Sequence, residues 1–118
     1  MAQNFNEWTN SMKQLTFQEL QHYLALKYRE GRTSSDLFMK LVEEVGEVAE
    51  VLNQLDGRNK YSGETSLEIE LVDVIHYAVA IASIHHIDLT EAIINKDKQA
   101  AMKYNQSPNL EEYLELQK

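Results

Sequence analysis

The stretch from Leu71 to Ile84, "LVDVIHYAVAIASI", is the feature that most restricts the fold of this chain. Its polar side chains are Asp73, His76 and Ser83, with Tyr77 partly polar. Apolar residues occur on every side when the stretch is placed on a helix. It is too short to span a bilayer, and Asp73 and His76 interrupt it. We therefore expect a central helix covered on all sides, and in a 118-residue chain a second subunit would supply part of that cover.

The rest of the chain also favours helices, because it has one proline, four glycines and no segment that alternates as a strand does. Helix starts are indicated where a short polar residue precedes an acid by three positions. These pairs are Thr16 with Glu19, Thr33 with Asp36, Thr65 with Glu68, and Asp88 with Glu91, while Ser107 before Pro108 suits the start of a short terminal helix. Residues 57–64 are the most loop-like segment. The expected fold is an all-α four-helix bundle with short terminal segments, one domain over residues 1–118 with its core at about 16–104, assembled as an oligomer.

The charge of the chain limits its partners. The formal net charge is -8 and basic residues do not cluster, which argues against a nucleic-acid polymer as partner. A small anionic ligand stays compatible with this charge if a divalent cation bridges it. Cysteine is absent, which excludes disulfides and zinc–thiolate sites, and the first residues lack the pattern of a signal peptide. We expect a soluble, cytoplasmic protein without a membrane partner.

The segment "LVEEVGEVAEVL" carries four glutamates, Glu43, Glu44, Glu47 and Glu50. The apolar stripe of its helix consists of Leu37, Leu41, Val45, Val48, Leu52 and Leu55. Glu44 lies roughly 60° and Glu47 roughly 120° from the middle of that stripe, whereas Glu43 and Glu50 lie almost opposite it. Glu44 and Glu47 are therefore a pair at the edge of the core, about 5–6 Å apart at Cβ. Such a pair repels unless a hard cation such as Mg²⁺ neutralises it, and a solvated acidic face is the plainer alternative.

A second carboxylate pair, Glu70 and Asp73, occurs in "ELVD". Asp73 lies in the most apolar helix, where a buried and unpaired carboxylate costs several kcal/mol. A hydrogen bond to His76 or to a tyrosine would resolve that cost without a metal. If two antiparallel helices place both acidic pairs face to face, four carboxylates surround one point and a divalent metal is required.

Together, "EEVGE" and "ELVD", separated by 22 residues, resemble the EExxE…ExxD motif of the all-α nucleoside triphosphate pyrophosphohydrolases, the MazG-like and dCTP-pyrophosphatase group. The similarity covers roughly residues 16–104. It implies an all-α homodimer or homotetramer that cleaves a nucleoside triphosphate between the α and β phosphates. The products would be the monophosphate and pyrophosphate, in a housekeeping role on the nucleotide pool.

The resemblance also implies roles for particular residues. The metal ligands would be Glu44, Glu47, Glu70 and Asp73, with Mg²⁺ as the cofactor and Mn²⁺ as an alternative cation. Glu43 or Glu47 would orient or deprotonate the attacking water, and Lys96 would contact phosphate. Many members continue after that lysine with a basic "RYP" or "RWP" stretch, which this chain replaces by "KDKQAAMKYNQSPN". Lys98, Lys103 or Tyr104 would then contribute to substrate binding instead.

Two other functions stay open. Asp73 and His76 form a D-x-x-H pair close to the Glu-x-x-His of oxidative di-metal bundles, although that architecture needs two such pairs and the first acidic helix has no histidine. A non-catalytic helical interaction protein would keep the fold without turnover. Arg29 and Arg32, in the loop before the acidic helix, are a further pair of cations within reach of a phosphate, although most loop arginines have no such role.

Overall fold

The computed structural model describes residues 13–57 and 66–118, and all regular structure in these two segments is helical. The helices are α2 (Phe17–Lys27), α3 (Ser34–Leu55), α4 (Leu67–Ile84), α5 (Leu89–Lys103) and α6 (Leu110–Leu116). The all-α class predicted from the sequence is confirmed. The expected loop at 57–64 lies almost entirely outside the described residues.

Three helix starts form as the capping pairs predict. Thr16 and Glu19 make a complete capping box at α2, in which the Thr16 hydroxyl accepts from the Glu19 amide and the Glu19 carboxylate accepts from the Thr16 amide. The side chain of Thr33 caps α3, and that of Asp88 caps α5. Side chains three positions apart meet at a helix start whatever the tertiary structure, so sequence alone locates these ends.

Two helix starts differ from the prediction. The N-cap of α4 is Ser66 rather than Thr65, and its hydroxyl accepts from the amide of Ile69. The terminal helix is capped by Asn109, in a capping box with Glu112, rather than by Ser107. In both places neighbouring polar residues offer the same capping chemistry, so the sequence identifies the helix but leaves its first residue open by one or two positions.

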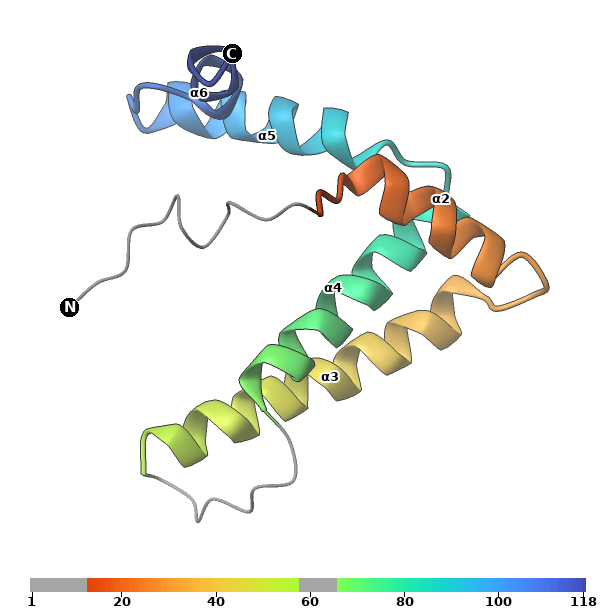
Figure 1. Ribbon diagram of the computed structural model, residues 1–118. Helices are drawn as coiled ribbons and strands as arrows, with labels where there is room; N and C mark the ends of the chain where they lie inside the picture. The colour runs from red at the N-terminus through yellow and green to blue at the C-terminus, as the bar shows by residue number, and fades with distance from the viewer. Residues whose placement is uncertain (1–12, 58–65) are drawn as a thin grey trace.

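The helices are arranged around α4 (Figure 1). Helices α3 and α4 form a long antiparallel hairpin, and α2 crosses the upper part of α4. Leu24 and Leu37 are fully buried and pack with Val79 and Ala80 where α2, α3 and α4 meet. Helix α5 runs away from the hairpin, with α6 folded against its far end. The core is therefore concentrated at one end of α4.

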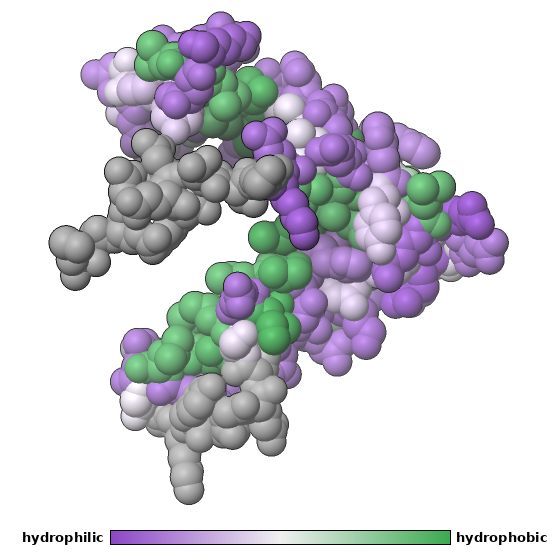
Figure 2. Space-filling view, in the orientation of Figure 1, coloured by the Kyte–Doolittle hydropathy of each residue, from purple (hydrophilic) through white to green (hydrophobic). Residues whose placement is uncertain are grey.

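The hairpin leaves much apolar surface uncovered. Large apolar side chains are exposed at six positions of α3 and four of α4, namely Phe38, Met39, Val42, Val45, Leu52, Leu55, Ile69, Leu71, Val72 and Ile75. They make a broad apolar band along the hairpin (Figure 2). Val45, Leu52 and Leu55 belong to the stripe predicted to face the core. The buried face of α3 is instead rotated toward Glu44, Val48 and Val51. No helix in the described residues is long and apolar enough to cross a membrane.

Candidate metal centre

Three carboxylates meet where α3 and α4 pack together. Glu44 comes from the middle of α3, and Glu70 and Asp73 come from the first two turns of α4. One carboxylate oxygen from each lies within 4.8 Å of the other two. The predicted face-to-face arrangement of the two acidic segments therefore forms, with one residue from the first segment and two from the second.

The burial of these acids follows from the faces that the two helices present to each other. Glu44 lies one turn from Val48 on the buried face of α3, and its side chain is partly buried. Glu70 is 6 % exposed, and the Oε2 atom of its carboxylate is buried. Asp73 follows one turn later on the same face of α4 and is partly buried. These acids occupy positions that an ordinary helix hairpin would fill with apolar residues.

Crowding of the three acids changes the protonation of Glu44. A hydrogen bond between its carboxyl group and that of Glu70 is the largest cause that raises the pKa of Glu44, to about 7. Burial and the negative charges of Asp73, Glu70 and Glu43 act in the same direction. In the absence of a cation, the carboxyl group of Glu44 therefore keeps its proton up to near neutral pH.

The other two glutamates of the first motif lie outside this group. Glu47 is exposed on α3, and it is absent from the set of acids whose oxygens converge among the described residues. Glu43 is also exposed, and its Oε2 lies 3.4 Å from Nζ of Lys40. Both point more toward solvent than the converging three. The ligand role predicted for Glu47 and the catalytic roles predicted for Glu43 and Glu47 stay predictions.

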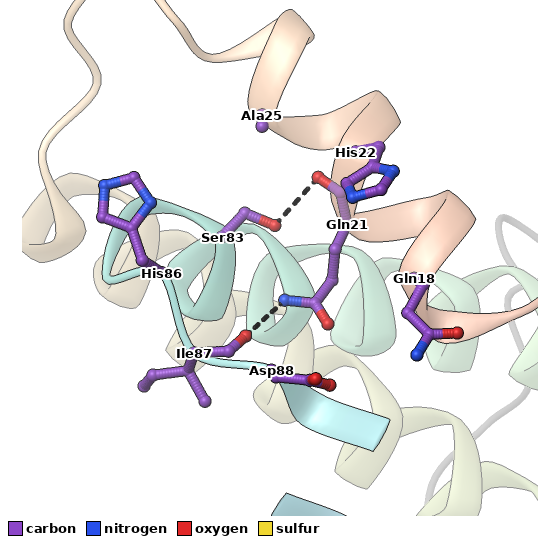
Figure 3. A pocket seen from close by; sticks show the side chains of 8 residues that line it. All are labelled: Gln18, Gln21, His22, Ala25, Ser83, His86, Ile87 and Asp88. Carbon is purple, nitrogen blue, oxygen red and sulfur yellow. Dashed lines mark hydrogen bonds between the residues drawn. The ribbon is translucent and has the colours of Figure 1, made fainter. Parts of the chain in front are cut away.

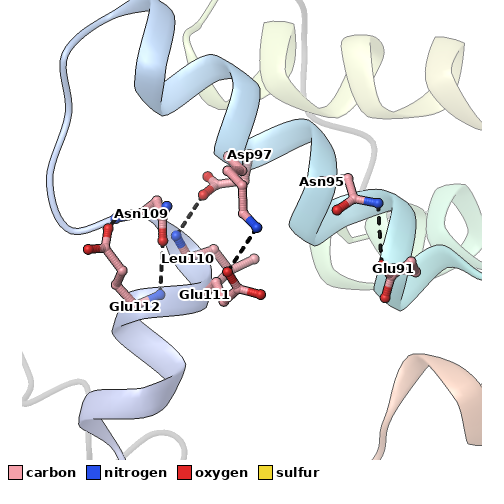
Figure 4. A network of polar contacts seen from close by, with 8 residues as sticks. Glu91, Asn95, Asp97, Asn109, Leu110, Glu111 and Glu112 are labelled. Carbon is pink, nitrogen blue, oxygen red and sulfur yellow. Dashed lines mark hydrogen bonds and ion pairs between the residues drawn. The ribbon is translucent and has the colours of Figure 1, made fainter.

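The three residues predicted to bind substrate lie on α5 or at its end. Lys96 lines a shallow groove of about 460 Å³ together with Ala92, Ile93, Asp97 and Ala100, all from α5. Lys98 makes a 3.0 Å ion pair with Glu111 of α6. Next to it, the amide of Leu110 donates a 2.6 Å hydrogen bond to Asp97 (Figure 4). Tyr104 is exposed at the end of α5, with Nζ of Lys103 5.4 Å from its ring centre.

These residues are not brought to the carboxylates within one chain. Helix α5 diverges from the hairpin after its first turns and contacts α2 and α6 instead (Figure 1). Their proposed contact with phosphate would therefore need a second chain or a different arrangement of α5. Lys98 would also have to leave Glu111.

A hydrogen-bonded pair that sequence reasoning did not find lies one turn beyond Asp73. The hydroxyl of Tyr28 and Nε2 of His76 are 2.7 Å apart, and their rings meet edge to face. Burial is the main cause that lowers the pKa of His76, and the charge of Lys27 adds to it, while Asp73 opposes it. A neutral His76 is thus tied to α2. The two residues are 48 positions apart in the sequence, so no local sequence pattern predicts this hydrogen bond.

The comparison with known families agrees with this geometry. A family model described as "MazG nucleotide pyrophosphohydrolase domain" matches residues 32–104, which is more than half of the chain. This protein belongs to the MazG family. The matched range contains α3, α4 and α5 entire, and with them all three converging carboxylates. A search of curated proteins found no match.

The carboxylates of this MazG domain fit a hard divalent cation. Mg²⁺ prefers oxygen ligands and binds through a small number of carboxylates while it keeps some of its water. Glu44, Glu70 and Asp73 supply three such oxygens. A hydrogen bond with Glu70, burial and the charges of the neighbouring acids raise the pKa of Glu44, and a cation would reverse the last of these effects. His76 does not belong to the converging group among the described residues, so the arrangement lacks the carboxylate–histidine pairs of an oxidative di-metal bundle.

Proposed function

We propose that this protein is a Mg²⁺-dependent nucleoside triphosphate pyrophosphohydrolase. It would cleave a nucleoside or deoxynucleoside triphosphate between the α and β phosphates and release the monophosphate and pyrophosphate. The observation that carries the proposal is the convergence of Glu44, Glu70 and Asp73 within 4.8 Å on helices that belong to the family-matched range. The whole chain would act as one MazG-like domain.

Each residue near the centre has a defined part in this proposal. Glu44, Glu70 and Asp73 would hold the cation, and Mn²⁺ would substitute for Mg²⁺. When bound, the cation supplies charge neutralisation for the polyphosphate and a Lewis acid for phosphoryl transfer. Glu47 lies one turn from Glu44 and is exposed, and it would orient a water or take its proton from the solvent side. Glu43 is the alternative base, and it would first have to release Lys40.

Self-association is the second part of the proposal. The apolar band of α3 and α4 exposes Val72 at 58 % and Ile75 at 50 %, in a protein whose net charge otherwise favours solubility. Contiguous apolar patches beyond a few hundred Å² mark interaction surfaces. A second copy of the chain would cover this band, as a homodimer or homotetramer, and would bring further residues beside each carboxylate centre. Lys96, Lys98 and Tyr104 of that copy are candidates for phosphate contact.

Substitution inside the apolar band tests the assembly. Val72→Lys should reduce the molar mass measured by light scattering after size exclusion, because a lysine at the covered face must be desolvated. Leu26→Lys on α2, at a position exposed to 64 %, serves as the matched control and should leave the mass unchanged. A wild-type chain that is monomeric at micromolar concentration would contradict this part of the proposal.

The activity is tested with a panel of nucleoside triphosphates, canonical and modified, each with Mg²⁺ and with separation of the products. Pyrophosphate plus monophosphate is the expected result. Asp73→Asn should abolish turnover, while Glu50→Gln, an exposed glutamate of the same acidic segment, should retain it. Release of orthophosphate alone, absence of turnover with every nucleotide, or full activity of Asp73→Asn would each reject the proposal. In the second case the chain would be a non-catalytic helical interaction protein.

A further inference from the structure

A polar groove lies between α2 and the carboxyl end of α4, away from the carboxylates. It consists of two adjoining cavities of about 290 and 320 Å³, which share Ala25, Ser83 and His86. Figure 3 shows the first cavity, with Gln18, Gln21 and His22 on one wall and Ser83 and residues 86–88 on the other. Asp73 and Ser83 are ten residues apart on α4, so the groove is about 15 Å along the helix from the carboxylate centre.

One face of α2, continued by Tyr28 and Arg29 just past the end of the helix, forms one wall of the groove. Gln18, Gln21, His22, Ala25, Tyr28 and Arg29 line the two cavities and follow the spacing of three and four residues that defines a helix face. All but Ala25 have large polar or aromatic side chains. Because Ala25 sits in the middle and carries only a methyl group, the two cavities communicate across it. A large residue there would close the groove.

Basic side chains outnumber acidic ones in the lining of the groove, although the protein as a whole is acidic. Arg29, Arg32, His22 and His86 line it, against a single acid, Asp88, whose Oδ1 already accepts from the amide of Glu91. The carboxyl ends of α2 and α4 lie close by and contribute about half a negative charge each. The two positive charges of Arg29 and Arg32 exceed this partial negative charge. Glu30 approaches Nε of Arg29 only to 4.0 Å, with both side chains mostly exposed.

His86 occupies its position at a conformational disadvantage. Its φ is +56°, and it follows α4 in a motif in which the amide of Ile87 bonds the carbonyl of Ala82 and the amide of His86 bonds that of Ser83. Glycine or asparagine usually takes this left-handed position. The equivalent position after α5 is indeed an asparagine, Asn105, with φ +55°. Histidine adopts this conformation more often than most other residues do, and here its ring lines both cavities of the groove.

The floor of the groove is fixed before any ligand arrives. The side-chain amide of Gln21 donates 2.6 Å to the carbonyl of Ile87, and its oxygen accepts 3.1 Å from the amide of Leu89. The hydroxyl of Ser83 donates 3.1 Å to the backbone carbonyl of Gln21. Tyr28 is held by His76. These bonds lock α2 against the α4–α5 turn, so that binding loses little conformational freedom at the walls.

From this geometry we propose that the groove binds a phosphate-bearing small molecule of mononucleotide size, at a site separate from the carboxylate centre. Arg29 and Arg32 would hold the phosphate through charge-assisted hydrogen bonds, the contact for which the guanidinium is best suited. His86, His22 and Gln18 would meet the remaining polar edge of the ligand. This site needs no metal and no hydrolysis, so it does not depend on the activity proposed above.

The test uses the full chain in the presence of EDTA, which removes divalent cations from the carboxylates. Adenosine and cytidine monophosphates and inorganic phosphate are titrated separately, and binding is followed by calorimetry and by amide shifts in ¹⁵N-labelled protein. We expect at least one of the three to bind and to shift Ala25, Ser83 and His86. If a monophosphate binds and inorganic phosphate does not, the nucleoside contributes part of the affinity. If both bind, the phosphate group accounts for the affinity.

Three variants locate the site. Arg29→Gln with Arg32→Gln should weaken binding by about tenfold per arginine, and Ala25→Met should block it by filling the groove without changing charge. His86→Gly should gain thermal stability, because it relieves the left-handed strain, and yet lose affinity. Asp73→Asn, at the carboxylate centre, should bind as the wild type does. The proposal is overturned if none of the three probes binds, or if the two arginine substitutions and Ala25→Met leave the affinity unchanged.

Discussion

Magnesium affinity is expected to rise with pH, because the carboxyl group of Glu44 must release a proton before it can bind a cation. The hydrogen bond with Glu70, burial and the neighbouring acids raise the pKa of Glu44 to about 7. At pH 5.5 the protonated form then exceeds the ionised form by about 30-fold, and at pH 8 almost all of it is ionised. The apparent affinity for Mg²⁺ should therefore increase about 30-fold from pH 5.5 to pH 8 and change little above that.

The raised pKa of Glu44 also determines how the stability of the metal-free protein should depend on pH. The pKa of Glu44 is about 7 in the folded chain and about 4.5 when unfolded, so the folded state holds the proton more tightly. The free energy of unfolding should consequently fall as pH rises from 4.5 to 7, because ionisation adds charge to a crowded carboxylate centre, and should level off above pH 7. Saturating Mg²⁺ should remove this loss.

Calorimetric titration of Mg²⁺ between pH 5.5 and 8 measures the first effect, and thermal unfolding with and without Mg²⁺ measures the second. Glu44→Gln should bind Mg²⁺ weakly, with a much flatter pH profile, and should be more stable than the wild type without metal at pH 8. Glu50→Gln is the control and should retain the wild-type profile. A wild-type affinity that is constant across this range, or an unchanged pH dependence in Glu44→Gln, would refute the reasoning.

Three further substitutions test the packing that holds the centre in place. Leu24→Ala should lower the free energy of unfolding in denaturant by about 2–5 kcal/mol, because Leu24 is fully buried, and a loss below about 1 kcal/mol would contradict the assigned core. Tyr28→Phe removes the 2.7 Å hydrogen bond to His76 and should cost about 1–2 kcal/mol in the same assay, whereas Tyr23→Phe, at an exposed tyrosine of the same helix, should be neutral. Thr16→Ala breaks the capping box of α2 and should cost about 0.5–2 kcal/mol, with faster amide exchange in the first turn as its local sign.

Sequence reasoning was most accurate where structure depends on near neighbours. The first residues of α2, α3 and α5 follow from capping residues at a fixed short spacing. The predicted starts of α4 and α6 differ from the observed ones by one or two positions, because adjacent polar residues can serve as the cap. The two acidic segments were also recognisable, because carboxylates repeated at helical spacing next to apolar residues have few structural reasons to be there.

Prediction was less accurate where the outcome depends on how helices pack. The predicted apolar stripe of α3 includes Val45 and Leu52, which stay exposed, because α4 packs one row away and takes Glu44 into its contact face. A helical wheel shows which residues share a face. It does not show which apolar face packs against another helix of the same chain and which stays available to a second chain.

The amino-acid sequence by itself determined the class of the fold, the main helices and the pair of acidic segments, since each depends on local spacing or on the composition of one helix. Only the tertiary structure selected Glu44, Glu70 and Asp73 from the available acids, because convergence within 4.8 Å requires a particular crossing of α3 and α4. Tertiary structure likewise placed Lys96 on a helix that diverges from the carboxylates. It also opened the groove beside Ala25, where two helix ends 58 residues apart in sequence, at 25 and 83, face each other.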